Sequence, residues 1–480
     1  MDYRDHLTQI FRAGLRRVDP VAMMQETLTL EGDTLRVQTA EEELSLDLSR
    51  YQRIFVLGAG KATASMARGL EMILGDRITE GVISVKYGHT DELSRVRMIE
   101  SGHPVPDQNS VRAADAILAL AKEADEKTLC INLVSGGGSA LLSKPASFPE
   151  SGLSIGLDEQ QNTTKALLAS GAPIQEINTV RKHLSGIKGG RLAAAMHPAT
   201  SLNLILSDVI GDRLDNIASG LTAPDTTTYG QVADLFARYD LRERLDPAVV
   251  AIVDAGVAGT IPETPKEGDP VFAGVRNVLL GTNYLAILAA AERARELGYQ
   301  PVIITSRLTG EAREAAKFIL GIAQDQASRE LLAKGPACLL FGGETTVTIR
   351  GEGKGGRNQE MALSALQMMA DDPTGTGGIH FLAASTDGND GPTDAAGAFA
   401  DPELVRTLGP GAPASGSRAP AESPAAEGQL PGPAGSRRHL SIDDYLKRND
   451  SYHFFEAVGG LLKTGATNTN VCDLQIVLVP

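Results

Sequence analysis

The first half of the chain alternates between two hydrophobic patterns. Short apolar runs at 53–57, 81–85, 129–134 and 202–206 have the length of buried strands, whereas 61–74 and 109–122 carry apolar residues at helical spacing. An amphipathic helix pattern and a polar connector fill 1–50. Strands that alternate with helices predict a mostly parallel α/β sheet with helices on both faces. Ligands of such sheets bind at the carboxyl ends of the strands.

A second alternating block begins near residue 275. Its apolar runs predict strands at 275–280, 301–305, 337–341, 345–349, 379–384 and 474–479, and its helical patterns lie at 283–297, 310–333 and 358–370. We therefore predict two domains: a Rossmann-like N-terminal domain over 1–258 and an α/β C-terminal domain over 275–480, joined by a Gly- and Pro-rich linker at 259–274. The Pro, Ala, Gly and Ser residues of 409–436 predict a disordered surface insertion, because they offer little apolar surface to bury.

Composition narrows the class of protein. The net charge of -15 over 480 residues argues against nucleic-acid binding, which requires a basic face. The three cysteines are far apart, which is typical of reduced thiols in a cytosolic protein. The first residues lack the apolar core of a signal peptide, and no run of about 18 apolar residues predicts a membrane span. We expect a cytoplasmic protein without a membrane partner.

The first glycine-rich turn follows the apolar run at 53–57. Gly58, Gly60 and Lys61 lie in GAGKA, which matches neither common nucleotide loop. Ala62 replaces the Ser or Thr of a Walker A loop, and Thr63 replaces the third glycine of a dinucleotide fingerprint. A tight turn at a helix N-terminus with a lysine still suits an anion. A plain strand–helix turn with a surface lysine is the alternative.

The second turn follows the apolar run at 129–134 and contains three consecutive glycines between two serines: Ser135, Gly136, Gly137, Gly138 and Ser139. Such a run lets backbone amides approach a phosphate closely. A flexible connector is a poorer explanation directly after a buried strand.

Segment 179–192 is the most basic part of the chain. Arg181, His183, Lys188 and Arg191 are candidates for binding substrate or phosphate, and the three long cations share a face if the segment is helical. The alternatives are a solvated helix face and, for His183, a role in packing.

Carboxylates follow two predicted strands. Asp208 could bind a metal or accept the proton of a substrate hydroxyl, and its alternative role is to cap a helix. Asp387 and Asp390 lie in STDGNDGPTD, which suits Mg²⁺ or polyol hydroxyls, although Asx-rich turns are common.

The densest glycine region lies between 342 and 360. Its cations precede a predicted helix, and charge-assisted contacts are what a transferring phosphoryl group needs. The candidate residues are Gly343, Glu344, Lys354, Gly355, Arg357 and Asn358.

Together these motifs resemble the class II glycerate kinases. The matching strings are GAGKA at 58, GHPVPD at 102, SGGGSALL at 135, TVRKHLSGIKGGRLA at 179, SDVIGD at 207, GGETTVT at 342, GKGGRNQE at 353, STDGNDGPTDAAGA at 385, RNDSYHFF at 448 and TGATNTNVCDL at 464. The resemblance implies a C-terminal domain of the MOFRL type, an active site in the cleft between the domains, and ATP-dependent phosphorylation of D-glycerate at its 2-hydroxyl with Mg²⁺. Lys61 and Arg357 match the basic residues that the family uses at the phosphates.

The resulting hypothesis is phosphoryl transfer. Lys61, Lys354 and Arg357 would supply charge, Asp387 or Asp390 would hold Mg²⁺, and Asp208 or another carboxylate would accept the hydroxyl proton, while Arg181 and Arg191 are candidates for the glycerate carboxylate. Two alternatives remain open: an NAD(P)H-dependent hydroxypyruvate reductase, and a non-catalytic binder of sugar acids or nucleotides. The number of subunits also stays open, with a homodimer among the options.

Overall fold

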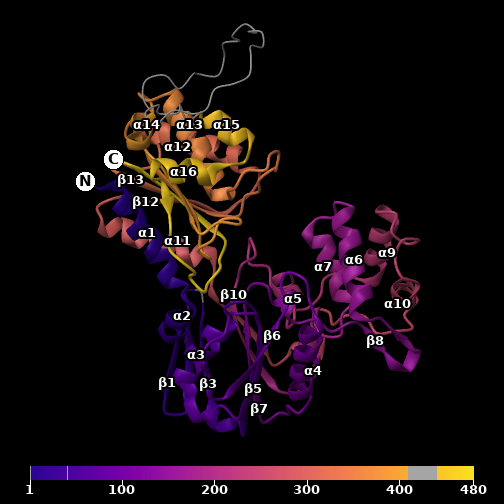
Figure 1. Cartoon of the computed structure of the whole chain (residues 1–480). Coiled ribbons are helices and arrows are strands. Elements are labelled where there is room, and N and C mark those ends of the chain that lie inside the picture. Colours follow the sequence, from indigo (N-terminus) through magenta and orange to yellow (C-terminus); the bar gives the residue numbers. More distant parts are fainter. Residues whose placement is uncertain (1, 41, 409–440) are drawn as a thin grey trace, which may run out of the picture. The chain divides into compact units, whose positions relative to one another are not determined.

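The computed structural model describes residues 2–40, 42–408 and 441–480 (Figure 1). The chain forms two compact units. The large unit contains Gly14–Ala286 and Thr467–Cys472, and the small unit contains Met1–Ala13, Ile287–Ala466 and Asp473–Pro480. The insertion predicted at 409–436 lies outside the described residues.

The large unit is built on a parallel sheet with the strand order β11-β10-β7-β4-β5-β6. In chain order the strands are β4 (Arg53–Ala59), β5 (Glu80–Lys86), β6 (Val96–Ser101), β7 (Thr128–Val134), β10 (Thr200–Leu206) and β11 (Val275–Gly281). Its central strand β7 is buried along its whole length. The predicted parallel α/β sheet is thereby confirmed.

Helices cover both faces of this sheet. One face packs against α4 (Gln108–Lys122) and α8 (Arg191–Met196) through a core that includes Phe55, Leu57 and Ile117. The other side carries α2 (Pro20–Thr27) and α3 (Thr63–Leu74), as Figure 1 shows. The alternation of core residues along β4 explains why both faces need a helical layer.

Four further helices of the large unit share a separate core. They are α6 (Leu157–Ala169), α7 (Ile174–His183), α9 (Tyr229–Arg238) and α10 (Pro247–Val257), and their core includes Val180, Phe236 and Ile252. The basic segment 179–192 is not one helix, because α7 ends at His183 and α8 begins only at Arg191. Gly190 between them has a φ of +82°, which an L side chain rarely adopts. Arg181, Lys188 and Arg191 therefore do not share a helical face.

Residues 3–47 contain more structure than the predicted helix and connector. The amphipathic helix is α1 (Tyr3–Arg17), and α2 follows it directly. A small antiparallel sheet then forms from β1 (Leu28–Glu31), β2 (Thr34–Gln38) and β3 (Glu43–Asp47). Its strands are short and mostly half exposed, so their hydrophobic pattern is weak.

The small unit has a mixed sheet with the order β12-β13-β17-β14-β15-β16. Strands β12 (Gln300–Leu308) and β13 (Ala337–Gly343) are parallel, whereas β17 (Asp473–Val479), β14 (His380–Ser385), β15 (Gly397–Ala400) and β16 (Leu461–Leu462) pair antiparallel. The helices are α11 (Asn283–Glu296), α12 (Ala312–Arg329), α13 (Arg357–Asp371), α14 (Pro402–Leu408), α15 (Ile442–Lys447) and α16 (Ser451–Val458). The strand predicted at 345–349 is absent from this described segment, where only Thr346 forms a bridge, to Glu311.

The division between the units differs from the predicted linker at 259–274. Strand β11 extends the large sheet by pairing with β10, with Leu202 opposite Arg276, so the segment that begins at 275 continues the first unit. The chain passes to the small unit inside α11, between Ala286 and Ile287. The apolar pattern of a strand does not reveal which sheet the strand joins. Here the pairing of β11 with β10 places β11 in the large unit.

Two further expectations concern cysteines and membranes. Cys130, Cys338 and Cys472 are all buried. Within the described part of the chain, no helix combines the length and apolar character needed to cross a membrane.

Candidate active site

Five parallel strands of the large unit deliver functional groups to the same edge of the sheet. Asp208 follows β10, the glycine run follows β7, Lys61 follows β4, Lys86 ends β5, and His103 follows β6. All these strands run in the same direction, so their carboxyl ends meet there. The predicted gathering of Lys61, the glycine run and Asp208 at this edge is confirmed.

The turns after β4 and β7 interlock. The amide of Lys61 donates to Gly136 O at 2.9 Å, and the amide of Ser135 donates to Ala59 O at 3.1 Å. Ser135 Oγ accepts from the amide of Ala62 at 3.1 Å, so the buried hydroxyl serves the N-terminus of α3. Gly60, with φ +152°, has no room for a side chain, because a Cβ would lie 2.0 Å from Ser135 Oγ. Ser135 thus shapes the turn and is not open to a ligand.

Two other predicted residues of these turns also have structural places. Gly58 lies inside β4, where a Cβ would come within 2.1 Å of Leu133 O on the neighbouring strand. Ser139 Oγ lies 2.8 Å from Ser219 Oγ, which in turn donates to Asn178 Oδ1 on α7 at 3.3 Å. Ser139 therefore connects the glycine turn to α7, and Gly58 permits close strand packing.

The three glycines after Ser135 line the site itself. A Cβ on Gly136 would lie 2.2 Å from Asp208 Oδ2, and one on Gly137 would lie 3.0 Å from His103 Nε2 and 3.3 Å from Lys61 Cε. A Cβ on Gly138 would lie 2.9 Å from Ala59 O. The amides of Gly136 and Gly137 donate to no acceptor among the described residues. The loop is therefore a backbone surface on which an anion can lie against Lys61 and Asp208.

The charges at this edge alter several pKa values. Burial raises the pKa of Asp208, and the nearby charge of Lys61 only partly opposes that rise. Burial lowers the pKa of His103 to about 4, helped by the positive charges of Lys61, Lys86 and His89. Neither Lys61 nor Lys86 forms an ion pair with any described residue. The edge thus combines unpaired cations, a neutral imidazole and a carboxyl group that holds its proton more readily than usual.

His103, Lys86 and His89 are site residues that our motif reasoning missed. His103 stands in the GHPVPD string directly after β6. Its position at the carboxyl end of a strand could have indicated a site residue. A single histidine in a Pro-rich turn is weak evidence by itself, however, and its closeness to Gly137 is visible only in the structure.

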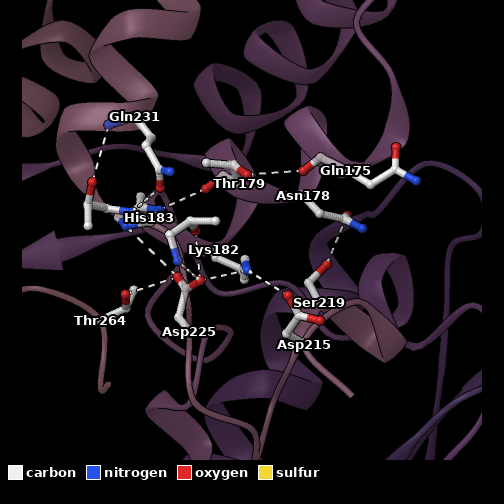
Figure 2. Close-up of polar contacts among 12 residues, drawn as sticks. Gln175, Asn178, Thr179, Lys182, His183, Asp215, Ser219, Asp225, Gln231 and Thr264 are labelled. Atoms are coloured by element: carbon white, nitrogen blue, oxygen red, sulfur yellow. Dashed lines mark hydrogen bonds and ion pairs between the residues drawn. The ribbon is translucent and has the colours of Figure 1, made fainter. Parts of the chain in front are cut away.

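The basic segment of the large unit contains a buried ion network (Figure 2). Lys182 Nζ lies 2.6 Å from Asp225 Oδ1 and 3.8 Å from Asp215. His183 is fully buried, with Nδ1 2.8 Å from Thr179 O and Nε2 2.9 Å from Glu263 Oε1. Figure 2 shows Lys182 and His183 turned toward Asp225. Because both ring nitrogens face protein acceptors, the structure contradicts the prediction that His183 contacts substrate.

The other three cations of this segment differ in how freely they could bind an anionic ligand. Lys188 is buried and donates to Leu142 O at 2.7 Å; burial and the charge of Arg181 lower its pKa to about 7. Arg191 donates to Lys182 O at 2.9 Å. Arg181 is half-buried, and burial lowers its pKa. Arg181 has no hydrogen-bond or ion-pair partner among the described residues, which makes its guanidinium the one here most open to an anionic ligand.

Arg357 lies in the small unit, at the start of α13. Its guanidinium binds Asp473 through two contacts, Nε to Oδ2 at 2.5 Å and Nη2 to Oδ1 at 2.8 Å, and Nη1 lies 2.9 Å from Glu344 Oε1. Burial opposes its charge, but the Asp473 pair outweighs that effect and raises its pKa. Two carboxylates therefore already neutralise the predicted phosphate-binding arginine. Glu344, which was predicted to contact the nucleotide, is one of these two carboxylates.

Asp390 and Asn358 have places that exclude their predicted roles. Asp390 caps α13 by accepting from the amides of Asn358 at 3.1 Å and Gln359 at 2.8 Å, and it also accepts from Asn358 Nδ2 at 3.2 Å. Both side chains are almost fully buried. Burial raises the pKa of Asp390 to about 6. Asp390 is therefore no metal ligand, and Asn358 is no nucleotide contact, because the unpaired amides of a helix N-terminus bind this carboxylate.

The remaining candidates of the small unit are only partly engaged. Asp387 is half-buried, and its Oδ1 accepts from Ser385 Oγ at 2.8 Å and from the amide of Asn389 at 3.0 Å. Lys354 Nζ lies 4.3 Å from the centre of the Tyr452 ring and pairs with no described carboxylate. Gly343 and Gly355 allow close packing. A Cβ on Gly343 would lie 2.2 Å from Leu308 O, and one on Gly355 would lie 2.2 Å from Ser451 Oγ.

Comparison with known proteins decides the family. Residues 6–254 match a domain family described as a domain of unknown function, DUF4147, and residues 337–413 and 432–473 match the MOFRL family. A glycerate 2-kinase from Pyrococcus horikoshii is 38% identical over 100% of this chain and 98% of its own. The chain belongs to the glycerate kinase family. The recognition and the two-part α/β fold predicted from the sequence are thus confirmed.

The glycerate kinase family also includes solved structures and differently named members. The crystal structure of a glycerate kinase from Thermotoga maritima superimposes with a TM-score of 0.82 and 35% identity, covering 100% of this chain and 99% of that one. A putative hydroxypyruvate reductase from Agrobacterium vitis is 39% identical over 89% of this chain and 99% of its own length. Two activities are therefore named among glycerate kinase relatives, and the residues at the sheet edge have to discriminate between them.

Proposed function

We propose that this chain is an ATP-dependent glycerate 2-kinase that transfers a phosphoryl group to the 2-hydroxyl of D-glycerate and forms 2-phosphoglycerate. Family membership supports the activity. The observation that carries the proposal is the glycine run Gly136–Gly138, whose open backbone lies against Lys61 and Asp208. This arrangement offers amides and a cation to a phosphate and a carboxylate to the attacking hydroxyl.

Lys61 and the glycine turn serve the phosphoryl group in this proposal. A transferring phosphoryl group spreads negative charge over its equatorial oxygens, so catalysis depends on positioning and on fixed positive charge. Lys61 has no carboxylate partner among the described residues, and the amides of Gly136 and Gly137 have no protein acceptor there. These donors can therefore stabilise the phosphate oxygens without first breaking internal contacts.

Asp208 and Arg181 act on glycerate, the substrate that accepts the phosphoryl group. Asp208 lies against the same glycine turn, and its raised pKa makes it a better proton acceptor than an ordinary aspartate when it is ionised. In the proposed reaction the 2-hydroxyl oxygen attacks phosphorus, the bond from phosphorus to the bridging oxygen of ADP breaks, and Asp208 takes the hydroxyl proton. Arg181 binds the glycerate carboxylate through its guanidinium, which has no partner in the part of the chain that the structure describes.

Mg²⁺ is the implied metal. The described residues contain no group of three or more His, Cys, Asp or Glu side chains that could hold a metal. Proteins commonly bind Mg²⁺ through one or two carboxylates and the substrate phosphates. Asp387 is the carboxylate that we propose as its ligand, since among the described residues its hydrogen-bond donors are directed to Oδ1 and leave Oδ2 available. Bound Mg²⁺ would neutralise charge on the phosphate oxygens.

Two basic residues of the small unit also carry proposed roles. We propose that Arg357 acts on the nucleotide side together with Lys354, as the family resemblance implies. Its pairing with Asp473 and Glu344 fixes its guanidinium plane, so any phosphate contact uses an already oriented group.

The hydroxypyruvate reductase alternative is disfavoured by the sheet edge. Dinucleotide-binding folds use a third glycine in the first turn and an acidic residue after the second strand for the ribose. Here Thr63 occupies the glycine position, and β5 ends at Lys86. A ribose hydroxyl would therefore meet a cation where an acceptor is needed.

One set of assays separates the three functions. ADP release with ATP, Mg²⁺ and D-glycerate, with L-glycerate as the matched substrate control, tests the kinase. Oxidation of NADH or NADPH with hydroxypyruvate tests the reductase. We expect ADP release with D-glycerate and no nicotinamide oxidation. Binding of nucleotide with neither reaction would instead identify a non-catalytic protein and contradict the proposal.

A further inference from the structure

The edge of the large sheet carries a group of basic side chains, one lysine and two histidines, that the phosphoryl-transfer scheme does not use. Lys86 ends β5, His89 follows it, and His103 follows β6. All three are half-buried, and they belong to the two outermost strands on this side of the sheet. They lie beside Lys61 closely enough for its charge to affect both histidines.

His103 reaches back across the sheet edge. Strands β4 and β5 separate β6 from β7 in the sheet. The ring of His103 nevertheless lies 3.0 Å from the position of a Cβ on Gly137, the residue that follows β7 by three positions. The imidazole thus lies over the same glycine turn whose amides are open to an anion.

The carboxylates around this group do not neutralise its lysines. The charges of Lys61 and Lys86 act on both His89 and His103, and no described carboxylate forms an ion pair with any of the four. The surrounding carboxylates have other partners: Asp107 accepts from Tyr87 OH and Ser110, Glu100 from the amide of Gly88, and Asp91 from Ser65 and Arg68. Asp208 is half-buried and lies against Gly136. In a chain with a net charge of -15, two lysines without an ion-pair partner among the described residues form a local positive charge that can attract an external anion.

We propose that Lys86, His89 and His103 form, with Lys61, the binding site for a tetrahedral phosphoryl anion, and that His103 takes up a proton when the anion binds. The anion belongs to ADP, ATP or the phosphorylated product, so the identity of the ligand rests on the proposed function. In the free protein, burial and the neighbouring cations keep the pKa of His103 near 4, and the ring is neutral at pH 7. A bound dianion reverses that balance, because a nearby opposite charge favours the protonated imidazole.

Proton uptake makes anion affinity depend on pH in a defined direction. A group that is neutral when free and protonated when bound strengthens binding as the pH falls. Sulfate is the suitable probe, since it stays a dianion between pH 5.5 and 7.5 whereas inorganic phosphate titrates in that range. We expect the full-length protein to bind sulfate up to about 100-fold more tightly at pH 5.5 than at pH 7.5, because one fully linked proton changes the affinity about tenfold per pH unit.

Two variants and their controls test the individual residues in calorimetric sulfate titrations. His103→Gln should reduce the pH effect to about twofold or less, whereas His197→Gln, at an exposed histidine after α8, should keep it. Lys86→Met should weaken binding about tenfold at both pH values, and Lys165→Met on the exposed side of α6 should not. Equal sulfate affinity at both pH values, or an unchanged pH effect in His103→Gln, would overturn the proposal.

Nuclear magnetic resonance of the ¹³Cε1-labelled histidines identifies the source of the anion. Saturation with ADP or with 2-phosphoglycerate should shift the His103 signal, identified by its loss in His103→Gln, toward the protonated position at pH 7. The ligand that produces the shift is the source, and a signal that moves with neither contradicts the inference. If the protein releases ADP from ATP in the presence of glycerate while His103 stays neutral with either ligand bound, only this inference fails. If His103 titrates while no hydroxy acid is phosphorylated, the proposed function fails alone.

Discussion

Asp208 is the residue whose proposed chemical role depends most directly on its surroundings. It lies at the end of β10, against Gly136 and near the charge of Lys61, and burial raises its pKa. A carboxylate with a raised pKa is a stronger base once it has lost its proton. The role therefore comes from burial at the sheet edge, where the attacking hydroxyl would also lie.

Replacing this carboxylate tests the role. Asp208→Asn should lower kcat by about 10²–10⁴-fold, the usual contribution of a general base. The native enzyme should lose activity as the pH falls through the raised pKa of Asp208, because protonation removes the base; the variant should lack that acidic limb. Steady-state rates across pH measure both effects. An acidic limb that persists unchanged in Asp208→Asn would assign it to another group.

Arg181 is a second test at the scale of one residue. Arg181→Met should raise KM for D-glycerate and leave KM for ATP unchanged, because its guanidinium is proposed to bind the glycerate carboxylate. Arg242→Met is the matched control, since Arg242 forms an exposed ion pair with Asp254. An equal rise in both KM values would show that Arg181 does not discriminate between the substrates.

At the scale of elements, the turns after β4 and β7 act as one unit. Gly136→Ala places a Cβ 2.2 Å from Asp208 Oδ2, so either the turn or the carboxylate must move. We expect kcat to fall about 10²-fold, since a displacement of about 1 Å has that effect on catalytic geometry. Gly230→Ala in α9 is the control, because its Cβ would meet only Thr228 Oγ1 at 3.6 Å. Full activity in Gly136→Ala would show that the contact is not needed.

The ion network at the end of α7 holds the helix that carries Arg181. Asp225→Asn leaves Lys182 buried without its 2.6 Å partner and should destabilise the fold by about 3–5 kcal/mol. Asp254→Asn removes an exposed pair and should cost at most about 1 kcal/mol. Denaturant unfolding measures both. Equal costs for the two variants would contradict the view that this network anchors α7.

The same network predicts how stability depends on pH. Burial alone would raise the pKa of Glu263, but hydrogen bonds from His183 and from the amides of Tyr229 and Thr264 outweigh it and hold the pKa at about 2. A carboxylate with a lowered folded pKa stabilises the fold above its unfolded value of about 4.3 and loses that contribution as the pH falls toward 2. Glu263→Gln should therefore flatten the loss of stability between pH 4.5 and 2.

At the scale of the whole molecule, the small unit begins at the N-terminus. Arg4 Nε lies 2.6 Å from the nearly buried Asp401, although almost 400 residues separate them. Arg4→Met should lower the stability of this unit by about 3 kcal/mol, because it leaves a buried carboxylate unpaired. Hydrogen exchange in β14 and α14 reports the effect. Arg12→Met, at an exposed position of α1, is the control, and an equal effect of both variants would contradict the assignment.

The sequence allowed the parallel sheet, its strand ends and the family to be predicted, because apolar runs and glycine turns are local signals. It placed Lys61, Gly136 and Asp208 at one edge correctly. It could not show that Asp390 caps α13, that Glu263 faces His183, or that His103 lies over Gly137, because each contact joins distant segments. Nor could it show that β11 pairs with β10, because that pairing is also a tertiary contact.

The central claim is that Lys61 and the glycine turn stabilise the phosphoryl group as it moves. The most direct test is the rate of ADP release by Lys61→Met with saturating ATP, Mg²⁺ and D-glycerate, alongside circular dichroism to confirm folding. Loss of one such electrostatic contact predicts a kcat lowered by about 10²–10³-fold in a fully folded protein. A folded Lys61→Met that releases ADP at the native rate would contradict the account.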